Sequence, residues 1–166
     1  YRLSENIDLR AGRLKIPFSR GGWVSSSRLL MIERSRTVST MVTALGAHVT
    51  PQIALQGRLK EGSISCNLAI IDGLEPDNAD SKFTGAKVSE NKNPSLVARV
   101  EISPKDWTEP RKSETHVGIG RHLTLGINAA FQNDIALNGQ TEDRSLFGCD
   151  FSFHQRGLTL QFEYLR

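Results

Sequence analysis

The chain has 166 residues, 38% of them hydrophobic and 23% charged, and its 21 basic and 18 acidic side chains give a net charge of +3. No stretch approaches the roughly 18 consecutive apolar residues of a membrane helix, which excludes a helical membrane protein. A membrane β-barrel is not excluded, because alternating apolar and polar residues average to a polar composition. The two cysteines, Cys66 and Cys149, are too few for a disulfide framework.

Apolar and polar residues alternate along most of the chain, and this period of two is typical of strands with one apolar and one polar face. In residues 123–131 the odd positions are Leu, Leu, Ile, Ala and Phe, and the positions between them are small or polar. Cys66 and Cys149 both fall on apolar faces. We therefore predict seven antiparallel strands, at residues 3–16, 46–59, 63–71, 95–103, 115–131, 143–154 and 157–166.

The predicted connections differ in length. Residues 60–63 and 155–157 form tight turns, whereas residues 72–94 and 132–142 form longer polar links. Outer-membrane barrels alternate in this way, with turns on the periplasmic side and longer loops outside. The predicted fold class is therefore all-β, an antiparallel transmembrane β-barrel in the bacterial outer membrane.

The predicted strands are expected to form part of a wider barrel. The chain begins at Tyr1 without a Met and stops at Arg166 within a predicted strand. Seven strands also do not make the even number with which bacterial barrels close. We predict that residues 1–166 form a single, partial barrel domain. A soluble, secreted β-sandwich that binds a ligand is an alternative, because packed sheets also hide one apolar face each.

Residues 17–45 are too long for a hairpin loop and too polar for a pair of strands. They hold four arginines and one glutamate, so their net charge of +3 equals that of the whole chain and the remainder is neutral. A long irregular segment inside a compact fold usually has a function. Inside a lumen, this charge would concentrate anions and oppose cations. We predict that residues 17–45 form a pore-constricting loop.

The first predicted strand, at residues 3–16, is less regular than the others because its apolar residues change parity near Gly12. A β-bulge at Gly12 would reconcile the two halves of the strand. On that interpretation Arg10, Arg13 and Lys15 all point to the polar side.

Several segments resemble, in order along the chain, those of the phosphate-selective porin O and P family. Residues 9–19 (LRAGRLKIPFS) resemble a strand of that family that ends in Lys-x-Pro-Phe before an inward loop. Residues 30–35 (LMIERS) and 98–100 (ARV) resemble two further family segments. Residues 46–73, which end in IIDG, and Asp150 with residues 162–164 (FEY) resemble two family hairpins.

The resemblance implies an outer-membrane barrel of about sixteen strands. It also implies a trimer, passage of small anions, and a loop after the Pro-Phe strand that narrows the lumen. Lys15 matches a position of the family motif. Combining the motif with the charge pattern, we predict that the pore-lining and anion-binding residues are Arg10, Arg13, Lys15, Arg28, Arg34, Arg36, Arg58 and Arg99. The alternative is that these arginines pair with lumenal carboxylates and only fix the loop in place.

We predict no catalytic residue, no metal site and no cofactor. The four histidines, at positions 48, 116, 122 and 154, lack metal-ligand spacing. The expected partners are outer-membrane lipid, small anions, and further copies of the chain or a larger outer-membrane complex, and we expect no nucleic acid. A structural barrel that holds a partner protein, without an open pore, is a second candidate function.

Aromatic residues are candidates for the girdles that line both membrane interfaces of outer-membrane barrels. Phe18, Trp23, Trp107 and Tyr164 are the residues considered for this role. Arg121 precedes the apolar band at 123–131, and we expect it to extend to the nearby interface.

Overall fold

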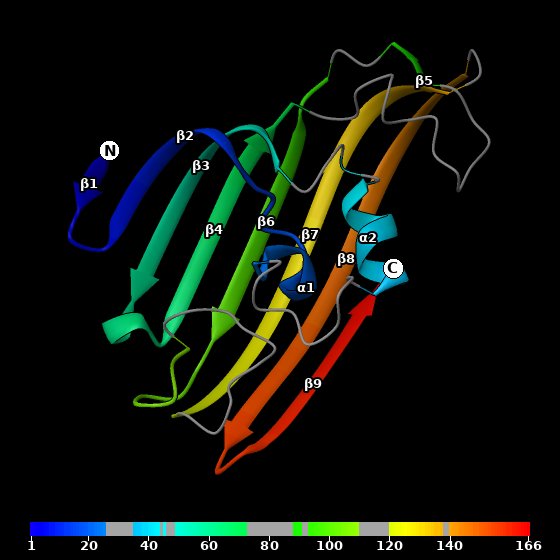
Figure 1. Cartoon of the computed structure of the whole chain (residues 1–166). Helices are drawn as coiled ribbons and strands as arrows, with labels where there is room; N and C mark the ends of the chain where they lie inside the picture. The colour runs from blue at the N-terminus through cyan, green and yellow to red at the C-terminus, as the bar shows by residue number, and fades with distance from the viewer. Residues whose placement is uncertain are drawn as a thin grey trace.

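A computed structural model describes residues 1–25, 35–43, 45, 49–72, 88–90, 93–109, 120–137 and 140–166. Two short helices and a sheet form this part of the chain (Figure 1). The helices are α1 (Arg20–Trp23) and α2 (Arg36–Thr43). The strands are β1 (Arg2–Ser4), β2 (Ile7–Lys15), β3 (Val49–Leu59), β4 (Ile64–Ile71), β5 (Val88–Glu90), β6 (Ser95–Ile102), β7 (Arg121–Leu137), β8 (Gln140–Gln155) and β9 (Leu158–Leu165).

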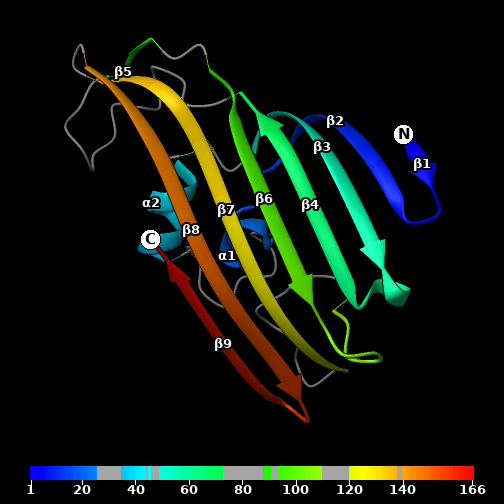
Figure 2. The same ribbon diagram turned by 180° about the vertical axis from the view of Figure 1, so that it is seen from behind.

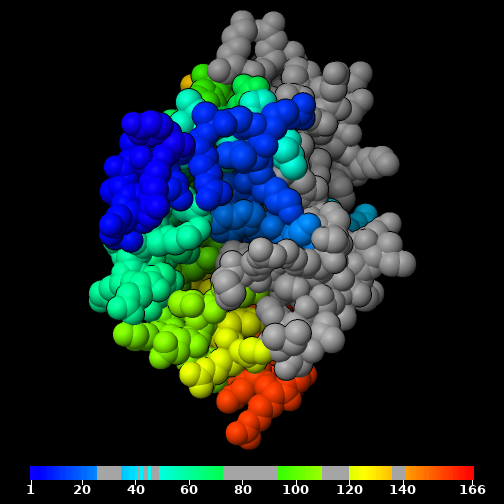
Figure 3. All heavy atoms as spheres, turned by 60° about the vertical axis from the view of Figure 1, so that its left-hand side comes forward, coloured from blue at the N-terminus to red at the C-terminus, as the bar shows by residue number. Residues whose placement is uncertain are grey.

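The sheet is an antiparallel meander. Its strand order is β1-β2-β3-β4-β6-β7-β8-β9, and β5 pairs with the far end of β7. Every neighbouring pair is antiparallel. The sheet does not close on itself, so β1 and β9 are its two edges. In Figure 3, β1 and β2 (blue) lie on one side of the molecule and the β8–β9 turn (orange-red) at its lower end.

All seven predicted strands are present, which confirms the all-β class and the antiparallel arrangement. The prediction of a loop at residues 132–142 is wrong, because β7 continues to Leu137 and β8 begins at Gln140. These residues form a hairpin that extends past β6, whose last partner on β7 is Phe131. The hairpin is polar because β6 no longer flanks it, so the alternation that revealed the other strands stops there.

The irregularity of the first strand has a different cause from the one predicted. The register between β2 and β3 runs from Ile7 to Lys15 without a shift, so the predicted bulge is absent. Instead Gly12 has a φ of +135°, a conformation that glycine tolerates and L-residues rarely adopt. β1 also folds back on β2 as a separate short strand.

The two faces of the sheet differ in composition, because cross-strand partners lie on the same face. Ile53, Ile70, Leu96 and Phe131 follow one another across four strands on one face. Gln56, Asn67, Arg99 and Asn128 follow one another on the other face. We call these the apolar face and the polar face.

The helices lie on the polar face, and the apolar face is uncovered in the described part of the chain. In Figure 1 α1 and α2 lie in front of the sheet, and Figure 2 looks onto the opposite face, with the helices behind the strands. Ile127 is 63% exposed and Phe162 is 62% exposed, and both belong to the apolar face. No second sheet packs on the apolar face among the described residues, in contrast to the interior of a sandwich.

A small apolar cluster fixes the segment after β2 to the polar face. Ile16, Phe18 and Leu45 pack on small and apolar side chains of four strands: Ala69, Ile71, Val97, Ala130 and Leu146. Phe18 is fully buried there, so the expectation that it joins a membrane girdle is wrong. The described helices are too short and too polar to act as membrane spans.

Candidate functional site

A buried ion cluster lies at the centre of the polar face. The Arg99 guanidinium donates to Glu101 Oε1 from Nε (3.0 Å) and Nη2 (2.8 Å), and Nη2 also donates to Asp150 Oδ1 (2.9 Å). The side chains of Arg99 and Asp150 are both 0% exposed. Ser65 donates to the other Glu101 oxygen at 3.0 Å. Strands β4, β6 and β8 are thereby joined by one charge-assisted network.

Gly126 leaves the space that this cluster needs. A Cβ at this position would lie 2.6 Å from Arg99 Nη2 and 2.6 Å from Asp150 Oδ2. Any side chain at position 126 would therefore displace the ion pair. Glycine occurs where another group approaches the backbone this closely.

A second buried ion pair fixes α1 over the sheet. Arg20 of α1 donates from both terminal nitrogens to Glu109, at 2.7 and 2.8 Å. The two side chains are 4% and 3% exposed. Glu109 lies in the connection between β6 and β7, so this parallel pair joins two segments that are 89 residues apart.

Strand β9 holds the start of α1 through a carboxylate. Glu163 Oε1 accepts from the Arg20 backbone N–H at 2.8 Å, and Oε2 accepts from the Gly21 N–H at 3.2 Å. The Ser19 side chain caps the helix by accepting from the Gly22 N–H at 3.0 Å. Helix N-termini carry unsatisfied N–H groups, and here the Glu163 carboxylate and the Ser19 hydroxyl oxygen accept from three of them.

The end of α1 is held by Lys15. The Lys15 ammonium donates to the backbone carbonyls of Val24 (3.0 Å) and Trp23 (3.4 Å). The Trp23 ring lies under the Arg99 guanidinium, 5.9 Å from its centroid. Trp23 thus lies on the polar face, and its predicted place in a membrane girdle is wrong.

A cavity of about 670 Å³ opens beside α1 on the polar face. Its strand residues come from β2, β3, β4, β6 and β7, and α1 contributes Trp23. Ser65, Ser103 and Thr124 line it with hydroxyl-bearing side chains. Its charged lining residues are Glu5, Lys15, Arg58, Glu61, Glu101 and Glu109. A cavity lined by polar side chains and by charges of both signs can admit small hydrophilic solutes.

Most of the charged groups around the cavity are already engaged within the protein. Glu101 and Glu109 are paired with Arg99 and Arg20 respectively, and Glu61 pairs with Lys105 at 2.9 Å. Arg58 is exposed, and its guanidinium has no acidic partner among the described residues.

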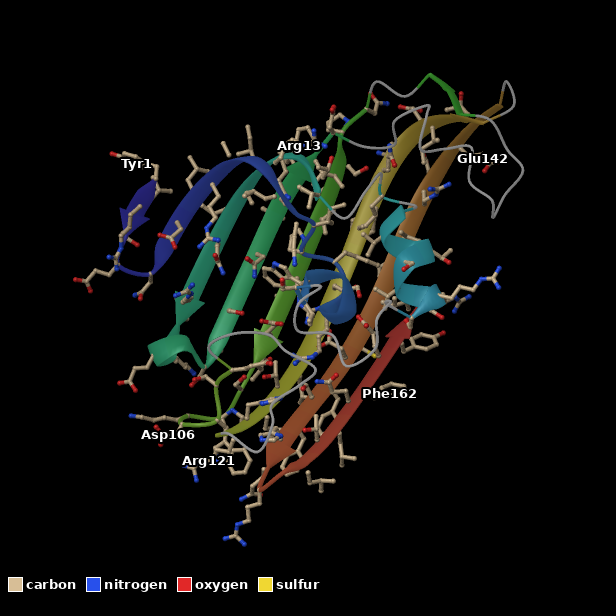
Figure 4. All side chains as sticks on the ribbon, in the orientation of Figure 1. Tyr1, Arg13, Asp106, Arg121, Glu142 and Phe162 are labelled. Carbon is tan, nitrogen blue, oxygen red and sulfur yellow. The ribbon has the colours of Figure 1, made fainter. Side chains whose placement is uncertain are left out.

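The eight predicted pore residues are therefore not one group. The structure places Lys15, Arg58 and Arg99 on or beside the polar face; Lys15 and Arg58 line the cavity, and the Lys15 ammonium also donates to carbonyls of α1 and its C-cap. Arg10 is exposed beside Asp8 at 3.8 Å. Arg13 and Arg36 are exposed, at β2 and at the start of α2 (Figure 4 labels Arg13). Arg28 and Arg34 lie outside the described residues.

Sequence reasoning missed the groups that hold α1 in place. Glu109 lies in a connection without periodicity, and no local pattern indicates that it pairs with Arg20. Glu163 lies within the predicted strand at residues 157–166, but its contact with α1 depends on the folded segment. A signal was present at Gly126, because a glycine inside a predicted strand indicates a close approach.

Two histidines lie at the lower end of the polar face. His122 Nε2 lies 2.7 Å from the Ser152 hydroxyl, and His154 Nδ1 lies 2.7 Å from the Thr159 hydroxyl. The two rings stack with centroids 5.9 Å apart. Within the described ranges, no group of His, Cys, Asp and Glu side chains is arranged to hold a metal ion.

Comparison with known proteins gives a relative but no family. No protein-family model matches the chain, and no solved structure matches it significantly. The chain is 29% identical over 172 aligned positions to a protein of Aquifex aeolicus described as "Uncharacterized protein". The match covers 98% of this chain and 42% of that protein, so the chain spans less than half of the relative's length.

Proposed function

We propose that this chain forms part of the wall of an outer-membrane β-barrel, which lets small hydrophilic solutes, with a preference for anions, diffuse across the membrane. The described part of the predicted constriction loop at residues 17–45, which holds α1 and α2, lies inside the lumen and narrows it. No bond is made or broken, and solutes move down their concentration gradients.

The observation that carries this proposal is the inverted burial of the sheet. Apolar side chains on one face are about half exposed, whereas polar and charged side chains on the other face are buried. A water-soluble protein rarely exposes a large continuous apolar surface. Barrels in a membrane turn an apolar face to lipid and a polar face to the lumen.

The segment that carries α1 and α2 (residues 16–25, 35–43 and 45), called the helical segment below, supports a narrowed lumen. It lies on the polar face and is held there by the Arg20–Glu109 pair, the Glu163 carboxylate and the Lys15 ammonium. Buried pairs of this kind are costly to break, because one partner is then left buried and uncompensated. A fixed constriction, rather than a mobile lid, is the arrangement that these contacts favour.

The anion preference rests on Arg58. The charges of Arg20 and Arg99 are balanced by buried carboxylates, so these arginines favour the alternative in which they fix the segment in place. Arg58 and Glu5 both line the cavity without an ion-pair partner among the described residues. Of the two, only the guanidinium binds carboxylate and phosphate groups through parallel hydrogen bonds. Weak binding at this point would select anions and still release them.

Planar-bilayer recordings of the full-length protein test the proposal. We expect discrete conductance steps and, in a potassium chloride gradient, a reversal potential of the sign that indicates anion preference. A protein that inserts but gives no conductance would contradict the channel and favour a structural barrel that holds a partner. A protein that stays monomeric in buffer without detergent would contradict both barrel functions.

A further inference from the structure

Arg121, Trp107 and Phe153 form a stacked cluster on the apolar face, at its lower end. The Arg121 guanidinium carbon lies 5.1 Å from the centroid of the Trp107 ring. Trp107 in turn stacks on Phe153, with ring centroids 6.1 Å apart. Arg121 and Phe153 share the face of Leu123 and Leu125 because of the β7–β8 register.

The backbone holds Trp107 in this position. The Leu123 N–H donates to the Trp107 carbonyl at 2.9 Å, and the Trp107 N–H donates to the Pro104 carbonyl at 3.0 Å. Asp106 turns the chain with a φ of +66°. Figure 4 shows Arg121 and Asp106 close to the lower end of the sheet, where β7 begins.

Two arginines at this end of the sheet have no ion-pair partner among the described residues. Arg121 and Arg156 are exposed, and neither has an acidic partner among the described residues. Arg156 lies in the β8–β9 turn, next to Gln155, which is the cross-strand partner of Arg121. The nearby Lys105 is paired with Glu61 at 2.9 Å, so it is already neutralised.

We propose that this cluster binds the phosphate headgroup of an anionic phospholipid, a proposal that rests on the membrane barrel proposed above. The rings of Trp107 and Phe153 lie at the boundary of the hydrocarbon, where the aromatic girdles of barrels lie. The cation–π contact with Trp107 holds the Arg121 guanidinium without using its N–H groups as donors to an oxygen. Two phosphate oxygens accept these N–H groups, and Arg156 adds a second positive charge.

Charge complementarity selects this occupant over a neutral lipid. Each basic residue near the headgroups of an anionic membrane strengthens binding by about fivefold. A phosphocholine headgroup carries a compensating positive charge that two arginines would repel. The cluster should therefore favour phosphatidylglycerol.

The test uses the full-length protein in vesicles of phosphatidylcholine with and without phosphatidylglycerol. Retained lipids are counted by native mass spectrometry after transfer to mild detergent. Resistance of the membrane pellet to alkaline carbonate reports insertion separately. The variant R121Q/R156Q is compared with R2Q, which removes the same kind of charge at the same end of the sheet. Arg2 is a matched control because its guanidinium already donates to the Ser4 and Glu5 carbonyls at 3.2 and 2.9 Å.

We expect R121Q/R156Q to insert and to lose phosphatidylglycerol by at least about fivefold, while R2Q retains as much as the wild type. R121K keeps the positive charge but loses the planar guanidinium, so it should retain an intermediate amount of phosphatidylglycerol. This single variant tests the lipid site even if R121Q/R156Q inserts poorly. Equal retention by all variants overturns the lipid site and leaves the barrel intact. If the protein retains added lipid A in preference to phosphatidylglycerol, the proposed phospholipid site is likewise overturned and the barrel is left intact. A wild-type protein that carbonate extracts overturns the barrel, and the lipid site with it.

Discussion

Adjacent residues of one strand lie in opposite environments. Ile127 of β7 is 63% exposed on the apolar face, whereas Asn128 is 5% exposed on the polar face. In a water-soluble protein the order would be reversed, because burying apolar area stabilises the fold by about 25 cal/mol per Å². Contact with an apolar medium would stabilise the apolar face, as the function proposed above requires. On the polar face the buried arginines Arg20 and Arg99 are paired with carboxylates.

Breaking the buried ion cluster should give the largest effect. Replacing Arg99 by Ala leaves the Asp150 and Glu101 carboxylates buried without their cation. We expect the free energy of unfolding to fall by about 3–5 kcal/mol, because an uncompensated buried charge is costly. Urea titration of the membrane-inserted protein measures this loss.

The exposed pair of Asp8 and Arg10, 3.8 Å apart, is the matched control for that substitution. R10A should change the free energy of unfolding by less than about 1 kcal/mol, because exposed ion pairs contribute little. Equal effects of R99A and R10A would contradict the view that the polar face is held by buried charge.

A charge on the apolar face should have the next largest effect. Replacing Ile127 by Arg should cost about 2–4 kcal/mol if residue 127 lies near the middle of a bilayer. At an exposed site in water the same substitution should change stability by about 0.5 kcal/mol or less. The same urea titration separates the two outcomes, with I127L as the control for packing.

Loosening α1 should have a smaller and local effect. In E163Q one carboxylate oxygen that accepts a helix N–H becomes an NH₂ donor facing that N–H. We expect a loss of about 1–3 kcal/mol in local stability, since a buried donor is left unsatisfied. Limited proteolysis should then cut within residues 16–45 faster than in the wild type. E142Q, at an exposed carboxylate, should be cut at the wild-type rate.

Removing the Arg58 charge from the cavity should give the smallest effect on stability and a clear effect on the preference for anions. R58Q should leave the free energy of unfolding within about 0.5 kcal/mol of the wild type, as expected for an exposed side chain. The reversal potential in a salt gradient should move toward zero. R36Q, which removes an exposed charge at the start of α2, is the control. An equal shift of the reversal potential in R36Q would mean that the helical segment, rather than Arg58, sets the anion preference.

The period of two predicted much of the fold. It gave all seven strands and assigned Cys66 and Cys149 to the apolar face, where the structure places both as free thiols. The reason is that one uniform environment on each side of a sheet imposes one residue class on every second position. Where the environment changes, as in the hairpin around residues 132–142, the pattern is lost and the strand was missed.

The roles of individual charges could not be predicted in the same way. Lys15 was expected to meet anions, but its ammonium donates to carbonyls at the end of α1. Arg99 was expected to line the pore, but two carboxylates surround it. Such contacts join residues far apart in the sequence, so no local spacing encodes them. The alternation of apolar and polar residues indicates which face of the sheet a charged side chain occupies. Its ion-pair partner depends on which strands the folded sheet brings together.

The environment of the apolar face can be measured directly with nitroxide labels placed one at a time at residues 123–125 and 127–131, in a chain that carries C66S and C149S. If lipid covers this face, labels at positions 125 and 127 collide with dissolved oxygen and are shielded from a water-soluble nickel complex. Labels at positions 124 and 128, on the polar face, are then shielded from oxygen. Free access of the nickel complex to position 127 in the folded protein would mean that water, not hydrocarbon, contacts the face, and the barrel proposal would be wrong.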